Sequence, residues 1–285
     1  MNIKEALQYG VKELENVETP LLDSQLLLAK ATGLTRIKVT VEFDREVQPE
    51  EEEKYISYIL DRKKGRPIAY ILKVQEFMGL DFHVEEGVLI PRPDTEILVE
   101  ECISYLKKIG KSKFVDIGTG SGAITVSLAK LLDDTEGTSL DISETALEIG
   151  KKNAKVQEVD QKILFLKSDV FSAIEKDESY MESIDLVVSN PPYIPKEVIE
   201  GLQVEVRDFE PRLALDGGID GLDFYRKIVI EGVKFLKKGG LMAFEVGHDQ
   251  AEEVKNLMEV SSVFTDIKII KDLSGISRVV TGIKI

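Results

Sequence analysis

The sequence predicts an α/β protein whose mostly parallel sheet is joined to a small helical domain. From about residue 112, apolar runs of strand length alternate with segments of helical spacing. This alternation is typical of βαβ units, whose crossovers make neighbouring strands parallel and place helices on both faces of the sheet. The last two strand-like runs are separated only by a short turn, so they must pair antiparallel. Before residue 74 the apolar residues recur at helical spacing.

The composition favours a globular protein with a sizeable core. The chain has 285 residues, of which 43% are hydrophobic and 31% charged. We expect no membrane span and no secretory signal, because apolar runs are short and the N-terminus lacks a basic-then-apolar pattern. The single cysteine, Cys102, excludes an internal disulfide and predicts a reducing cytoplasm. A net charge of −15 argues against a broad nucleic-acid-binding surface, which needs lysine and arginine.

Residues 1–73 are predicted to form a helical bundle of three or four short helices. The acidic run Glu50–Glu53 suits a helix N-terminus, and Gly65-Arg66-Pro67 ends the last helical pattern. Residues 74–91 change to alternating spacing and predict a β-hairpin linker, with its turn at Glu85–Gly87. A third region, 92–285, then begins with a helix.

The third region is predicted to contain seven strands. We expect parallel strands at 113–117, 138–141, 163–166, 184–189 and 240–246, then an antiparallel pair at 264–270 and 279–283; helices are expected at 123–132, 144–154 and 224–236. Open α/β sheets bind ligands at the carboxyl ends of their strands. Candidate site residues should therefore follow the strands.

A glycine-rich loop, Gly118-Thr119-Gly120-Ser121-Gly122, follows the first of these strands. Glycines allow a ligand to approach the backbone closely, and the N-terminus of the next helix offers free N–H groups. The spacing departs by one position from the G-x-G-x-x-G pattern of dinucleotide sites. This departure argues against a pyrophosphate-binding site.

Acidic residues follow or end the first three strands. Asp141 lies about 20 residues beyond the glycines, where a carboxylate can accept hydrogen bonds from both ribose hydroxyls; its alternative role is to cap the next helix. Asp116 could hold the glycine-rich loop through backbone N–H groups. In Ser168-Asp169-Val170-Phe171, Asp169 could accept from an adenine amino group with an apolar neighbour against the ring, or the segment could be an ordinary turn.

The fourth strand ends in Asn190-Pro191-Pro192-Tyr193. The two prolines remove two backbone donors and stiffen the chain as it leaves the sheet. The Asn190 side-chain oxygen and a proline carbonyl could accept the two N–H groups of a planar amide or amino group, with the ring of Tyr193 against its plane. The alternative is a turn that simply ends a strand.

Together these motifs resemble class I S-adenosylmethionine-dependent methyltransferases that act on planar nitrogens. A wider pattern is similar to the HemK/PrmC family, the peptide chain release factor glutamine methyltransferases. It comprises Gln75–Gly79, Pro91–Glu96, Glu210–Gly218, Gly221–Tyr225 and Phe244–Gly247. The resemblance covers nearly the whole chain and is weakest in the first 70 residues.

The resemblance implies a substrate, a cofactor and a set of site residues. The substrate is the glutamine of the Gly-Gly-Gln motif in bacterial class 1 release factors, and the methyl donor is S-adenosyl-L-methionine, which leaves as S-adenosyl-L-homocysteine. Cofactor-binding roles fall to Gly118, Thr119, Gly120, Ser121, Gly122, Asp141, Asp169, Val170 and Asn190. Asn190, Pro191, Pro192 and Tyr193 bind the glutamine, with Asn190, Pro191 and Tyr193 as catalytic residues. Many members carry tryptophan where Val170 stands, which leaves open whether Val170 or Phe171 packs on the adenine here.

The resemblance also implies that the helical domain recognises the release factor. Neither a membrane nor a nucleic acid is expected as a direct partner. No metal is required, and neither His83 nor His248 lies in a metal-like cluster. Four rival functions stay open: an adenine-amino DNA or RNA methyltransferase, a ribosomal-protein glutamine methyltransferase, a nicotinamide-dependent oxidoreductase and a non-catalytic binding module.

Overall fold

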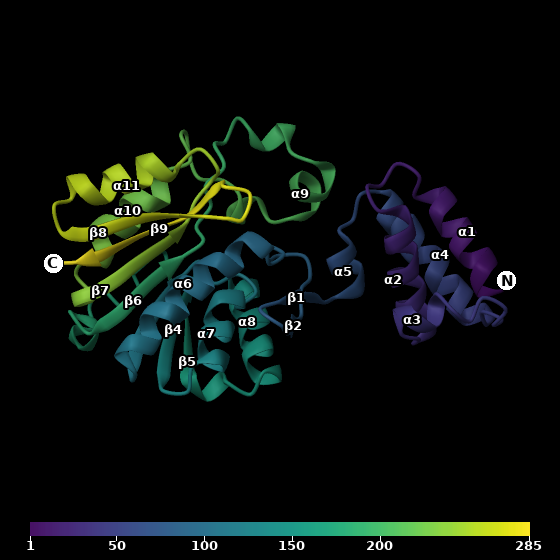
Figure 1. The fold of residues 1–285 in the computed structure, drawn as a ribbon, viewed down its shortest axis with the longest axis horizontal. Helices are drawn as coiled ribbons and strands as arrows, with labels where there is room; N and C mark the ends of the chain where they lie inside the picture. Colours follow the sequence, from purple (N-terminus) through teal and green to yellow (C-terminus); the bar gives the residue numbers. More distant parts are fainter. The chain divides into compact units, whose positions relative to one another are not determined.

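A computed structural model describes residues 1–285 as two compact units (Figure 1). The first unit contains residues 1–74 and 203–209, and the second contains residues 75–202 and 210–285. Residues 203–209, which lie within the predicted C-terminal region 92–285, are grouped by their contacts with the helical unit. No helix is long and apolar enough to cross a membrane.

The first unit is entirely helical. It consists of α1 (Ile3–Glu13), α2 (Pro20–Thr32), α3 (Arg36–Val39), α4 (Pro49–Lys63), α5 (Ile68–Leu72) and α9 (Val204–Phe209). Its core includes the fully buried side chains of Ile3, Leu27 and Tyr55, and the Tyr55 hydroxyl donates to the Ala6 carbonyl at 3.0 Å. Residues 1–73 thus form five helices rather than three or four, because the short α3 and α5 carry too few residues to show a period.

A buried ion pair joins the helices of this unit. The Arg62 Nε lies 2.7 Å from Asp23 Oδ2, and these side chains are only 6% and 4% exposed. Arg62 Nη2 also lies 2.7 Å from Glu205 Oε1, so the same guanidinium holds α9. Removing one partner of a buried pair leaves the other charge uncompensated.

We predict that Arg62→Ala lowers the free energy of unfolding of the helical unit by about 3 kcal/mol, the lower end of the cost of breaking a buried pair. The lower end applies because Thr19 still donates to Asp23 at 2.7 Å. Urea denaturation followed by circular dichroism at 222 nm measures this. The matched control is Lys64→Ala, where a side chain 72% exposed pairs with Asp61 and contributes less than about 1 kcal/mol. A loss for Arg62→Ala no greater than for Lys64→Ala would contradict the prediction.

The second unit starts with a hairpin whose turn lies earlier than the sequence suggested. Its strands are β1 (Gln75–Phe77) and β2 (Leu80–Phe82), paired antiparallel. The turn residues Met78 and Gly79 have φ angles of +54° and +73°. Two consecutive positive φ angles are what a tight two-residue hairpin needs. The chain also turns at Glu85–Gly87, where the Val88 N–H donates to the Glu85 carbonyl at 3.4 Å, but the predicted returning strand at 88–90 is wrong.

A seven-stranded sheet forms the centre of the second unit, in the order β5-β4-β3-β6-β7-β9-β8. The strands are β3 (Ser112–Ile117), β4 (Thr135–Asp141), β5 (Ile163–Lys167), β6 (Ile184–Ser189), β7 (Leu236–Glu245), β8 (Phe264–Lys271) and β9 (Ser277–Lys284). All pairs from β5 to β7 are parallel, while β9 pairs antiparallel with both β7 and β8. The predicted fold class is confirmed.

Helices cover both faces of this sheet (Figure 1). They are α6 (Pro93–Ile109), α7 (Ala123–Leu131), α8 (Glu144–Val156), α10 (Asp223–Gly232) and α11 (Ala251–Val260). Strand β6 shows how the two cores are filled: Val187 packs with residues of α10 and α11, whereas Leu186 and Val188 pack with residues of α6 and α7. Cys102 is fully buried in the second of these cores. Helix α11 was not predicted, and α10 ends four residues before the predicted end at residue 236.

Candidate functional site

A cavity of about 230 Å³ lies at the carboxyl ends of the parallel strands. Among the predicted site residues, its lining includes Gly118, Gly120, Asp141, Asp169, Val170, Asn190, Pro191 and Pro192. The other four, Thr119, Ser121, Gly122 and Tyr193, are not part of the lining. The turn at the end of β6 thus shares one cavity with the glycine-rich loop and with Asp141.

The glycine-rich loop is held from inside the protein. The φ angles of Gly118, Gly120 and Gly122 are +76°, +53° and +81°. Residues with a Cβ atom rarely adopt such positive φ angles. Asp116 Oδ2 accepts hydrogen bonds from the hydroxyls of Thr119 at 3.2 Å and Thr125 at 2.6 Å. Asp116 is fully buried, and this burial raises its pKa to about 6. Asp116 therefore anchors the loop, mainly through hydroxyl groups.

Asp141 links the loop to the next strand and faces the cavity. Its Oδ2 accepts from the Gly120 N–H at 2.9 Å and its Oδ1 from the Ser143 N–H at 2.8 Å. Helix α8 is capped by Ser143, whose hydroxyl accepts from the Ala146 N–H at 3.2 Å. Burial raises the pKa of Asp141, while these backbone bonds oppose the shift. Each carboxylate oxygen keeps acceptor capacity for hydroxyl groups of a ligand.

In the segment after β5, Asp169 and Val170 line the cavity, whereas Phe171 points into the core. Asp169 lines the cavity, but its side chain is 60% exposed and accepts from Lys227 Nζ at 2.8 Å. Val170 also lines the cavity and is buried, with a φ of +51°. Phe171 instead stacks on Phe235 in the core, with ring centroids 4.8 Å apart. Val170 is therefore the apolar side chain of this segment that a ligand in the cavity would meet.

The turn Asn190–Tyr193 begins where β6 leaves the sheet. The Ser189 hydroxyl donates to the Ile117 carbonyl at 2.7 Å, which ties the strand end to β3. The Asn190 Nδ2 donates to the Thr95 hydroxyl oxygen at 3.2 Å. The side chain of Tyr193 is partly buried against the core, and this burial raises its pKa to about 12.

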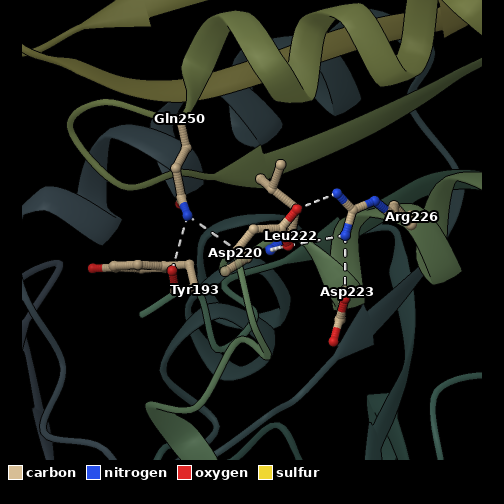
Figure 2. A network of polar contacts seen from close by, with 7 residues as sticks. Tyr193, Asp220, Leu222, Asp223, Arg226 and Gln250 are labelled. Atoms are coloured by element: carbon tan, nitrogen blue, oxygen red, sulfur yellow. Dashed lines mark hydrogen bonds and ion pairs between the residues drawn. The ribbon is translucent and has the colours of Figure 1, made fainter. Parts of the chain in front are cut away.

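Segment 215–221 and Gln250, the N-cap residue of α11, hold this turn through hydrogen bonds. The Ile194 N–H donates to the Leu215 carbonyl at 3.0 Å, and the Gly217 N–H donates to the Ile194 carbonyl at 2.9 Å. Figure 2 shows Gln250, whose Nε2 donates to the Tyr193 carbonyl at 2.9 Å. Neither Gln250 nor Gly217 was among the predicted site residues. The motif Glu210–Gly218 was the available signal for the latter.

An ion cluster fixes the end of the same segment. Arg226 Nη1 donates to Asp220 Oδ1 at 2.9 Å and to Asp223 Oδ1 at 3.1 Å (Figure 2). The Asp220 Oδ1 also accepts from the Leu222 N–H at 3.1 Å. The arginine lowers the pKa of Asp220 to about 2. The start of α10 is thus pinned to the segment that holds the Asn190–Tyr193 turn.

We predict that Gly217→Ala lowers kcat by at least about tenfold, because misplacing a reacting group by 1 Å can cost about a hundredfold. A Cβ on Gly217 would lie 2.7 Å from Tyr193 Cα and 2.8 Å from the Pro192 carbonyl oxygen, so the turn must shift. Steady-state kinetics measure the effect. The control is Gly201→Ala, where a Cβ meets nothing within 4 Å and activity should stay unchanged. Equal activity of the two variants would contradict the proposed support of the turn.

Comparison with known proteins decides the family. Residues 5–72 match the family described as PrmC N-terminal domain, and residues 94–205 match the one described as Methyltransferase small domain. The chain is 43% identical over 286 residues to the release factor glutamine methyltransferase of Clostridium acetobutylicum, covering 100% of this chain and 99% of the relative. The chain belongs to the release factor glutamine methyltransferase family.

A second relative agrees with this assignment, and a solved structure agrees with the fold. The release factor glutamine methyltransferase of Clostridium botulinum is 39% identical over 276 residues, covering 97% of this chain and 96% of the relative. In fold, the chain is similar to the human methyltransferase 10 domain containing protein, with a TM-score of 0.51, 16% identity and coverage of 72% and 88% of the two chains. The expected family is confirmed, and membership in the release factor glutamine methyltransferase family makes the chain an enzyme. The oxidoreductase and non-catalytic readings are thereby excluded.

Proposed function

We propose that this enzyme transfers a methyl group from S-adenosyl-L-methionine to the side-chain amide nitrogen of the glutamine in the Gly-Gly-Gln motif of class 1 release factors. The observation that carries the proposal is a single cavity lined by Asp141, by the glycine-rich loop and by Asn190-Pro191-Pro192. Asp141 offers a carboxylate, and the glycine-rich loop allows a ligand to approach its backbone closely. Asn190 and Pro191 offer oxygen atoms that can accept hydrogen bonds from a planar nitrogen. The names of the family members support the same substrate class.

The residues of the cavity fit an adenosyl group. Asp141 faces the cavity with spare acceptor capacity, which suits two neighbouring ribose hydroxyls. Leu140, Ile142 and Val170 add apolar surface to the lining, which suits the flat ring of adenine. Asp169 would accept a hydrogen bond from the adenine amino group, in competition with Lys227. The donor would supply an activated methyl group on a positively charged sulfur.

The task that falls to the protein is orientation. An amide nitrogen is a weak nucleophile because its lone pair is shared with the carbonyl. Holding reacting atoms about 3–3.5 Å apart and in line contributes several kcal/mol to the lowering of a barrier. The Asn190 side-chain oxygen and the Pro191 carbonyl would accept the two amide N–H groups and favour positive charge as it develops on nitrogen. The proton can leave to water once the nitrogen is methylated, so no protein base is needed.

Two further elements would complete substrate binding. Tyr193 follows the turn with its ring partly buried against the core, and we propose that its exposed part meets the plane of the glutamine amide. The helical unit, which includes the residues matched by the PrmC N-terminal domain, would recognise the release factor. We expect enzyme and substrate to meet in the cytoplasm, which also suits a chain with a single, buried cysteine.

A transfer assay tests the proposed function. The enzyme is incubated with radiolabelled S-adenosyl-L-methionine and, separately, with a release factor, with ribosomal proteins and with unmethylated DNA. We expect label only in the release factor, and none in a release factor whose Gly-Gly-Gln motif carries alanine in place of glutamine. Label in DNA or in a ribosomal protein, with none in the release factor, would overturn the proposal.

A further inference from the structure

Glu245 is a buried carboxyl group beside the proposed site that the account so far leaves unused. It is the last residue of β7 and is only 3% exposed. The pairing of Ser189 with Phe244 makes Asn190 and Glu245 the next residues along their adjacent strands. The buried Oε2 of Glu245 has no hydrogen-bond partner. A buried polar atom left without a partner is costly, so its retention asks for a reason.

No cation is dedicated to this carboxyl group. Arg278 of β9 lowers the pKa of Glu245 through its charge, but the guanidinium is shared between Asp94 at 3.0 Å and Asp272 at 2.9 Å. The polar side chains that favour the charged form of the Glu245 carboxyl, and so lower its pKa, are those of Thr95 and Asn190. Glu245 therefore lies beside Asn190 on the adjacent strand, and Asn190 is joined to Thr95 by the 3.2 Å bond from its Nδ2 to Thr95 Oγ1.

This arrangement bears on which end of the Asn190 amide faces the cavity. A side-chain amide has a donor end and an acceptor end of similar shape. The hydroxyl of Thr95 can donate or accept, so it cannot choose between them. An ionised carboxylate only accepts. It therefore attracts Nδ2 of Asn190 and the hydroxyl hydrogen of Thr95, and both interactions leave Oδ1 of Asn190 free.

We propose that Glu245 is a positioning residue whose carboxylate, directly and through Thr95, turns the Asn190 amide so that its Oδ1 faces the substrate amide. This inference rests on the proposed function, because only an N–H substrate needs the acceptor end of Asn190. Protonation of Glu245 removes the preference, since a carboxylic acid can donate to Oδ1 and turn the amide the other way. Activity should therefore follow the ionised form.

The expected pH dependence follows from the surroundings of Glu245. Burial is the largest of the effects that together bring its pKa to about 7; Asp94 also raises the pKa, whereas Thr95, Asn190 and Arg278 lower it. The other titratable groups that face it are Tyr193 and Tyr225, whose raised pKa values keep them neutral near pH 7. Positive charge bound in the cavity favours the carboxylate. We expect kcat of the wild-type enzyme to fall about tenfold per pH unit below a midpoint at or below about 7.

The test uses the enzyme, a release factor and three variants. Glu245→Gln keeps the shape but can donate as well as accept, so we expect kcat to fall at least about tenfold and the acidic fall of kcat to disappear. The KM for release factor and the Kd for S-adenosyl-L-methionine should stay within about threefold, because no contact to either is removed. Thr95→Val should behave like Glu245→Gln, whereas Thr95→Ser, which keeps the hydroxyl, should restore most of kcat.

The outcomes separate this inference from the function on which it rests. If the wild-type enzyme labels release factor and Glu245→Gln retains its kcat and its acidic fall, the positioning role is wrong. Equal losses in Thr95→Ser and Thr95→Val would also overturn it, because packing rather than the hydroxyl would then matter. If the wild-type enzyme does not label release factor, the proposed function fails first, and the inference falls with it.

Discussion

Replacing Asn190 with alanine lowers kcat for release factor methylation by at least about a hundredfold, while the enzyme still binds S-adenosyl-L-methionine. Removing one preorganised hydrogen-bonding group at the centre of charge development typically costs about 10²–10³ in kcat. The Asn190 side chain is such a group in our account, because it lines the cavity and its Nδ2 is already engaged with Thr95. Single-turnover kinetics with saturating donor measure the loss directly.

Cofactor binding provides the control for Asn190→Ala. Calorimetry should give a Kd for S-adenosyl-L-methionine within about fivefold of the wild-type value, since Asn190 is one of many residues that line the cavity. The thermal midpoint should also change little, because the side chain is only partly buried. A variant that folds, binds the donor and turns over within about threefold of wild type would rule out the orientation role of Asn190.

Replacing Asp141 with alanine weakens binding of S-adenosyl-L-methionine by about a hundredfold or more. Each hydrogen bond to a charged group contributes about 1.5–3 kcal/mol, and two ribose hydroxyls would be lost together. The substitution also leaves the Gly120 N–H without its 2.9 Å bond to Oδ2, which loosens the glycine-rich loop. Asp141→Asn should be intermediate, because an amide keeps one acceptor oxygen for these groups.

Asp169→Ala is the control that distinguishes a ribose contact of Asp141 from a general effect of removing a carboxylate from the cavity. Both carboxylates line the cavity, but Asp169 is 60% exposed and shares its Oδ1 with Lys227. We expect its replacement to weaken donor binding by less than about tenfold, since exposed charged contacts contribute little. Calorimetry on the three purified variants ranks them. Unchanged affinity in Asp141→Ala, or a larger loss in Asp169→Ala, would remove the ribose assignment.

Local sequence patterns predicted the centre of the sheet well. Strand β6 appeared at 184–189 because a run that is buried on both faces is apolar throughout. The glycine-rich loop and Asp141 were found from their spacing to neighbouring strands, and the structure brings Gly118, Asp141 and Asn190 to one cavity. Parallel strands present their carboxyl ends at the same edge, so chain order alone was sufficient.

Features that depend on distant contacts or on unusual backbone were not predicted. The hairpin turn was misplaced because Met78, a residue without an obvious turn preference, adopts a positive φ angle. Residues 203–209 group with the helical unit partly through the Arg62–Glu205 ion pair, which joins distant parts of the sequence. Gln250 and Glu245 likewise gain their importance only from residues that folding brings beside them.

The most direct test of the central claim is a crystal structure of the enzyme with S-adenosyl-L-homocysteine and a peptide that contains Gly-Gly-Gln. The account predicts that the glutamine amide nitrogen lies within about 3.2 Å of Asn190 Oδ1 and faces the sulfur, with Asp141 on the ribose. A complex in which the Asn190–Tyr193 turn points away from the sulfur, or in which the glutamine amide binds elsewhere, would contradict it.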